Sequence, residues 1–174
     1  MATRRKPRRG RGRGGSGIQS ITTCLGFKDR AEEAVKFYVS LFPNSKIVRL
    51  ARSETEGPIP KGKVLSATFR LFGREFMAFD AGPPFSFSIG MSLMVTCRTQ
   101  AEIDRLWEKL SMGGEKGPCG WLTDKFGVSW QIVPVALGEM LSDPKHGNSE
   151  AVMQAMLKMG KLDIETLERA YREG

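Results

Sequence analysis

The chain has 174 residues, enough for one domain with a substantial core but too few for two large ones. Its formal net charge is +8, but residues 1–17 hold seven cations and no acid, which leaves +1 for residues 18–174. The charge of the expected folded part therefore does not indicate a nucleic-acid-binding domain. No stretch reaches the roughly 18 apolar residues of a membrane-spanning helix, so we expect no membrane partner. Three cysteines without a C-x-x-C spacing argue against a disulfide framework and favour a reducing, cytoplasmic setting.

Residues 1–17 form a basic Arg/Gly-rich tail with five glycines and only two apolar residues. Such a segment buries too little apolar surface to offset the entropy of ordering it, so we expect it to be disordered. Its cations, at residues 4–13, would allow contact with nucleic acid. The favoured alternative is an inert solubilising extension or a misassigned start.

A first module is predicted over residues 18–81. Its expected elements are a strand at 18–27, a helix at 30–42, a strand at 47–51, a polar loop at 53–63 and a hairpin of 64–72 with 75–81. The helix shows an apolar stripe at helical spacing, formed by Ala31, Ala34, Val35, Tyr38 and Leu41. Asp29 followed by Glu32 resembles a capping box at its start.

A second module is predicted over residues 86–135, beyond a boundary at Gly82-Pro83-Pro84. It repeats the order of the first module about 70 residues later, with a strand at 89–97, a helix at 100–112 and a hairpin of 120–124 with 128–133. Thr99 and Glu102 form a second capping pattern. The repeat places any binding site between or inside the two halves. Cys24 and Cys97 take near-equivalent places in it, and we interpret both as core residues.

A helical extension is expected over residues 148–172, with helices at 149–159 and 164–171. Val152, Met156 and Met159 give the first of these helices a Met-rich apolar face. Such a face more often packs against the domain or a sister subunit than it binds a ligand. Because an apolar face left in water invites a partner, we predict a homodimer with these helices packed on the domain or across the interface.

Residue types that carry common chemistry are scarce. His146 is the only histidine and lies in a polar loop, so an imidazole-rich zinc, iron or nickel site is excluded. The chain has no G-x-S-x-G nucleophile elbow and no phosphate-binding P-loop. Asp80 and Asp124 are interpreted as turn residues. The remaining candidates are aromatic residues on or beside strands, which form either core or cavity lining: Phe69, Phe76, Phe79, Phe85, Phe87, Trp121, Phe126 and Trp130.

Several motifs resemble one known family. The segments 29–38 and 41–45, then 76–80, 82–85, 119–122 and 124–134, and finally 151–157 are similar, in order, to signatures of the PhnB-like branch of the vicinal-oxygen-chelate (glyoxalase/bleomycin-resistance) superfamily. The resemblance covers roughly residues 18–172. It implies an α+β fold, in which tandem β-α-β-β-β modules form one open cup of mixed sheet, here with extra C-terminal helices.

The resemblance also implies where a ligand would bind. Metal-dependent members of the superfamily have His, Glu or Gln at four strand positions, and the corresponding residues here are Thr22, about Met77, about Ser92 and Gln131. One neutral amide does not hold a divalent cation, so we predict no metal and no cofactor. The branch often carries the label demethylubiquinone methyltransferase. However, the first strand is not followed by the Gly-rich loop expected of an S-adenosylmethionine-binding sheet.

The leading functional hypothesis is metal-independent binding of an unknown small apolar molecule in the cup. The candidate lining residues are Thr22, Met77, Ser92, Trp121, Trp130 and Gln131. The alternatives are an enzyme, either a methyltransferase or a lyase acting on a quinone-like or other apolar substrate, and nucleic-acid contact through the tail. Whether the chain is an enzyme stays open at this point.

Overall fold

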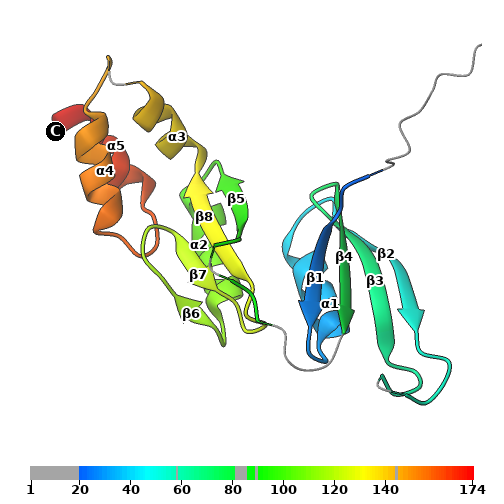
Figure 1. Cartoon of the computed structure of the whole chain (residues 1–174). Coiled ribbons are helices and arrows are strands. Elements are labelled where there is room, and N and C mark those ends of the chain that lie inside the picture. Colours follow the sequence, from blue (N-terminus) through cyan, green and yellow to red (C-terminus); the bar gives the residue numbers. More distant parts are fainter. Residues whose placement is uncertain (1–19, 58, 81–85, 89, 144) are drawn as a thin grey trace, which may run out of the picture.

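The computed structural model describes residues 20–57, 59–80, 86–88, 90–143 and 145–174. The basic tail and the predicted boundary at Gly82-Pro83-Pro84, together with Phe85, lie outside these residues. Two modules with the same order of elements follow one another along the chain, and three further helices follow the second module (Figure 1).

The first module contains β1 (Thr23–Phe27), α1 (Ala31–Leu41), β2 (Lys46–Arg52), β3 (Val64–Leu71) and β4 (Arg74–Asp80). The second contains β5 (Leu93–Cys97), α2 (Gln100–Ser111), β6 (Glu115–Lys116), β7 (Trp121–Thr123) and β8 (Ser129–Pro134). The sheet orders are β1-β4-β3-β2 and β5-β8-β7-β6. In each sheet the first strand pairs parallel with the last, and the other pairs are antiparallel. The predicted tandem repeat and α+β fold are confirmed.

The two first helices begin in different ways. The capping box of α2 is confirmed: the Glu102 amide donates to the Thr99 hydroxyl, and the Thr99 amide donates to the Glu102 carboxylate at 3.0 Å. The capping box predicted for α1 is wrong, because its N-cap is Arg30 and no N-cap side chain bonds the helix. Instead, the carboxylate of Asp80, at the end of β4, accepts from the Ala31 amide at 2.8 Å.

Several elements differ from the sequence-based expectation, among them β5, which begins at Leu93 where a strand was expected from residue 89. β6 has two residues and carries no periodic signal of its own. α3 (Val135–Ser142) follows directly on Pro134, where the sequence analysis placed only the end of a hairpin. Proline stands as the N-cap of this helix and ends the strand at the same point. β1 begins at Thr23, five residues later than expected, and Ile21 before it is 98% exposed.

One hydrophobic core joins both modules, because each sheet packs one face against its own helix and Tyr38 of α1 contacts Trp130 of β8, with 5.3 Å between the ring centroids. It includes Val35 and Tyr38 of α1, Ile103 and Leu110 of α2, and Trp130 of β8. The Arg105 guanidinium of α2 donates to the Leu41 carbonyl at the end of α1, at 3.1 Å. Cys97 is buried as expected. Cys24 is exposed, so its interpretation as a core residue is wrong.

The C-terminal helices form a core of their own. Leu137 and Met140 of α3 pack with Val152 of α4 (Ser149–Leu157) and with Leu167 of α5 (Ile164–Glu173). Met156 and Met159, from the Met-rich face, are half-buried against this cluster. The face that was expected to invite a partner is therefore largely covered within the chain. Within the described residues, none of the helices combines the length and the apolar character that crossing a membrane requires.

Candidate functional site

Each sheet has one face without a helix, and these two open faces both point toward the viewer in Figure 1. Residues paired across neighbouring strands point to the same side of a sheet. In the first sheet, a row that runs across all four strands joins Cys24, Met77, Thr68 and Arg49. Ala67, Phe69 and Ala78 occupy the opposite side and are buried against α1. The row therefore lies on the open face.

The second open face carries the equivalent row. Met94 pairs with Gln131, which pairs with Trp121. The Gln131 amide nitrogen donates to the Ser92 hydroxyl at 2.8 Å, which fixes the direction of the glutamine side chain. Met94 is 62% exposed, while Trp121 and Gln131 are half-buried.

The register relates the four predicted ligand positions to one another. Met77 pairs with Cys24 as Gln131 pairs with Met94, so Met77 and Gln131 are equivalent in the two modules. Thr22 precedes Cys24 of β1 by two residues, and Ser92 precedes Met94 of β5 by two residues. Both strands are edge strands, and both edges face the middle of the molecule (Figure 1). The repeat thus brings these positions to the inner edges of the two sheets.

Trp130 belongs to the core and not to the open face, which corrects its selection as a lining residue. It is 2% exposed, stacks on Phe42 at 5.7 Å between ring centroids, and donates its indole N–H to Asp124 at 2.8 Å. The reason is the two-residue period of a strand, which sends Trp130 and Gln131 to opposite sides. Phe69 and Phe76 are likewise buried, stacked on one another at 5.5 Å.

The donor groups at the four positions do not fit a divalent cation. A hydroxyl, a thioether, a second hydroxyl and an amide supply no negative charge, and the Ser92 hydroxyl already accepts from Gln131. In the described part of the chain, no three His, Cys, Asp or Glu side chains gather in a way that would hold a metal ion. These four positions can offer apolar contact and single hydrogen bonds.

The Asp124 carboxylate accepts four hydrogen bonds where the two modules meet, and two of them come from outside the predicted turn. It accepts from the Phe126 and Val128 amides, as expected of a turn residue. It also accepts from the Trp130 indole and, at 2.7 Å, from the hydroxyl of Tyr38 on α1. Burial, followed by the Asp124 charge, raises the pKa of Tyr38 far above its ordinary value, so the tyrosine stays a neutral donor. The buried cluster joins the modules and has no access to a substrate.

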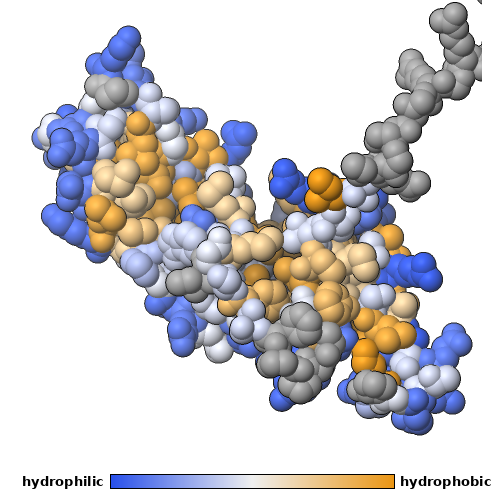
Figure 2. Space-filling view, viewed as in Figure 1, coloured by the Kyte–Doolittle hydropathy of each residue, from blue (hydrophilic) through white to orange (hydrophobic). Residues whose placement is uncertain are grey.

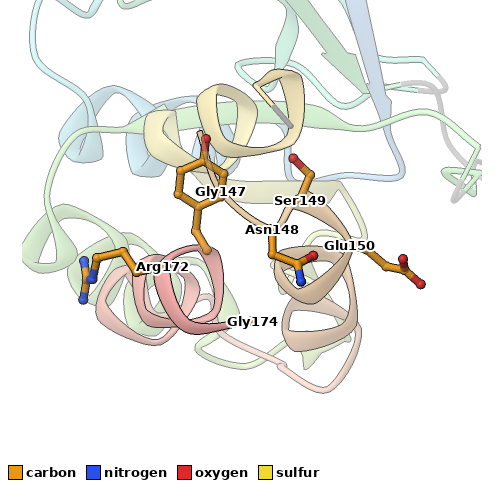
Figure 3. Close-up of a pocket in the computed structure, with 7 residues that line it drawn as sticks. Gly147, Asn148, Ser149, Glu150, Arg172 and Gly174 are labelled. Carbon is orange, nitrogen blue, oxygen red and sulfur yellow. The ribbon is translucent and has the colours of Figure 1, made fainter. Parts of the chain in front are cut away.

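Two hollows lie elsewhere on the surface. The larger, of about 510 Å³, lies between the start of α4 and the end of α5 (Figure 3). Its polar groups maintain the fold: Asn148 caps α4, Ser149 donates to the Met140 carbonyl, and Tyr171 donates to the Asp143 carbonyl. Glu150 and Arg172 point away from each other in Figure 3. No set of reactive groups converges there.

The second hollow, of about 360 Å³, lies at the start of α1 and is lined by charged residues. Four of these charges form two ion pairs, Arg30 with Glu33 and Lys36 with Glu32. Arg52 and Lys36 lower the pKa of Glu32 to about 2, and Arg30 and Lys125 do the same for Glu33. Lys125 belongs to the second module, so its 2.8 Å contact with Glu33 also ties the modules together. This charge network is structural.

The open faces remain the best candidate site. Figure 2, seen from the same side as Figure 1, shows apolar residues over the sheets and over the C-terminal helices, and hydrophilic ones toward the outer rims. Arg49, Lys46 and Arg70 also lie on the first open face, and the sequence analysis did not select them. The alternation of side chains along the strand could have placed Arg70 on this face. The position of Arg49 depends on a β-bulge, which cannot be recognised in the sequence.

Comparison with known proteins identifies the family. A sequence model of the 3-demethylubiquinone-9 3-methyltransferase family matches residues 19–133. A PhnB protein from Bacillus cereus, described as a 3-demethylubiquinone-9 3-methyltransferase, is 44% identical over 67% of this chain and 100% of its own, with a TM-score of 0.62. A protein from Pseudomonas aeruginosa is 23% identical over 67% of this chain and 98% of its own, with a TM-score of 0.56.

A Staphylococcus aureus protein is 36% identical over 67% of this chain and 97% of its own, with a TM-score of 0.32. Among curated proteins, none matches. The family match ends at residue 133, so α3, α4 and α5 lie beyond it. Given a match over both modules and a fully covered relative at 44% identity, the chain belongs to the PhnB-like 3-demethylubiquinone-9 3-methyltransferase family, with a glyoxalase/bleomycin-resistance fold.

Proposed function

We propose that the chain binds a small apolar molecule over the open faces of its two sheets, without a metal ion, in the cytoplasm. The observation that carries this proposal is the exposed sulfur-bearing side chains of the two open faces, the neighbouring Cys24 and Met77 on the first and Met94 on the second. Soluble proteins seldom expose contiguous apolar surface without a use for it. Methionine also adapts its shape to an apolar ligand. Trp121 adds an aromatic side chain to the second face, and Gln131 with Ser92 adds one oriented polar pair.

The binding proposal is tested with N-phenylnaphthylamine, an uncharged aromatic probe that fluoresces in apolar surroundings. We expect saturable binding that is unchanged by EDTA and that slows maleimide labelling of Cys24. Met77→Asp should weaken binding at least tenfold, because the ligand would then have to desolvate a carboxylate.

Met153→Asp is the matched control for Met77→Asp. Met153 lies on α4 and is 38% exposed, against 37% for Met77, so both variants place one carboxylate on a similarly exposed surface. Equal binding by Met77→Asp and the wild type, or no saturable binding at all, would contradict the proposal.

The family's name supports a second candidate, a methyltransferase acting on a quinone-like substrate. Titration with S-adenosylmethionine in a calorimeter separates the two. Stoichiometric binding of S-adenosylmethionine would favour the enzyme, and no heat change would favour the binding protein. Contact with nucleic acid through residues 4–13 concerns a segment outside the described residues and is tested by deleting that segment.

We also propose that the chain forms a homodimer, on grounds that differ from the C-terminal argument. β1 and β5 are edge strands, and the described residues give neither a second strand partner. Ile21, Met91 and Met94 beside these edges are at least 62% exposed. Unpaired strand edges flanked by apolar side chains favour association with another chain. A second copy would cover both edges at once.

A further inference from the structure

The outer half of the first open face carries positive charge. Lys46 pairs with Arg70, and Arg49 pairs with Thr68, so all three cations point to the same side of the sheet. Arg70 has a partner on that face, the Glu75 carboxylate at 3.4 Å. Arg49 differs: in the parts of the chain that the structure describes, no carboxylate lies within 4.0 Å of its guanidinium.

A β-bulge places Arg49 there. The register of β2 against β3 skips one residue between Ile47 and Arg49, so Val48 has no opposite partner. Without this extra residue, Val48 would pair with Thr68 and its side chain would occupy the open face. The bulge replaces an apolar side chain with a cation at that position. Bulges often re-aim a side chain at a binding site in this way.

The row that contains Arg49 has a graded polarity. It runs from the Arg49 cation through the Thr68 hydroxyl to the thioether of Met77 and the thiol of Cys24. Three strand spacings separate its ends, a span of about 14 Å. By contrast, Arg52, the next cation on β2, is held by two hydrogen bonds to Glu32. The free guanidinium therefore stands at the far end of the apolar surface.

We propose that the ligand of the first open face is an amphipathic anion, with its apolar body over Met77 and Cys24 and its acidic group on the Arg49 guanidinium. This inference rests on the proposed function and specifies its ligand class. The guanidinium presents a planar pair of donors that matches carboxylate, sulfonate or phosphate oxygens. The shared chemistry is one acidic group joined to an apolar body no longer than about 14 Å.

Two dyes with one aromatic body test the inference. Anilinonaphthalene sulfonate carries an acidic group, and N-phenylnaphthylamine does not. We expect the sulfonate to bind the full chain at least fivefold more tightly than the neutral dye, and its affinity to fall as NaCl rises. Arg49→Gln should weaken sulfonate binding about tenfold and leave the neutral dye unchanged.

Arg169→Gln on α5 is the matched control, since Arg169 is exposed and forms no ion pair within the described residues. It should leave both dyes unchanged. Equal affinities for the two dyes, or equal losses from Arg49→Gln and Arg169→Gln, would overturn the amphipathic-anion inference while leaving apolar binding intact. If neither dye saturates, the proposed function itself fails. If the sulfonate binds as expected, competition by alkyl carboxylates and by alkyl phosphates distinguishes which acidic group the site prefers.

Discussion

At the scale of single residues, Asp124 shows how one carboxylate can join two modules. It is 2% exposed and accepts four hydrogen bonds, two from its own turn and two from Tyr38 and Trp130. The sequence predicted the turn, because Asp124 ends an expected strand just before a turn that contains Gly127. It did not predict the bond to Tyr38, because 86 residues separate the partners in the chain.

Removing the Asp124 carboxylate should destabilise the fold strongly. Asp124→Ala leaves the Tyr38 hydroxyl and the Trp130 indole without their buried acceptor, and we expect the free energy of unfolding to fall by about 3 kcal/mol or more. Tyr38→Phe removes one donor only and should cost about 1–2 kcal/mol. Urea unfolding monitored by tryptophan fluorescence measures both. A loss for Asp124→Ala no larger than for Tyr38→Phe would show that the other three bonds contribute little.

At the scale of elements, the sequence predicted the order of strands and helices better than their ends. The apolar stripes of α1 and α2 were predicted correctly, because the spacing of apolar residues in a helix can be recognised within the segment itself. The cap of α1 was not, since its acceptor is Asp80 at the end of β4, 49 residues away. For the candidate site, adjacent Trp130 and Gln131 were both assigned to the cup, although strand alternation forbids it. Met77 and Gln131 were found through the family resemblance, and the register shows that they are equivalent in the two modules.

The two helix starts should respond alike to removal of their different caps. Asp80→Ala removes the acceptor of the Ala31 amide, and Thr99→Ala removes the acceptor of the Glu102 amide. We expect each to lower the free energy of unfolding by about 1 kcal/mol. Thermal unfolding followed by circular dichroism measures the change, and Asp80→Asn, which keeps an acceptor oxygen, should recover part of the loss. No change in Asp80→Ala would mean that water replaces the carboxylate at this helix start.

At the scale of the whole molecule, the C-terminal helices act as an added layer on the second module. The amides of Cys119 and Gly120, before β7, donate to the carbonyls of Met159 and Gly160, both at 2.7 Å. Gln100, at the start of α2, bonds the Leu162 carbonyl and the Ile164 amide. Because most apolar side chains of this layer pack within the chain itself, its presence does not require a second copy.

The C-terminal helices and the β1 and β5 edges are the two candidate dimer interfaces, and changing them should have different effects. Deleting the residues after Gly147 exposes Leu137 and Met140, so we expect a lower melting temperature. We expect no change in oligomeric state, because the proposed interface is at β1 and β5. Met94→Asp should instead give a monomer near the chain mass of 19.3 kDa by size-exclusion chromatography with light scattering.

Met112→Asp is the control for Met94→Asp, since Met112 is 63% exposed at the end of α2 and Met94 is 62% exposed. It should remain dimeric, because Met112 is the C-cap of α2 and belongs to neither β1 nor β5. A monomer produced by the deletion, with Met94→Asp still dimeric, would move the interface to the C-terminal helices. A full-length monomer at tens of micromolar would refute dimerisation itself.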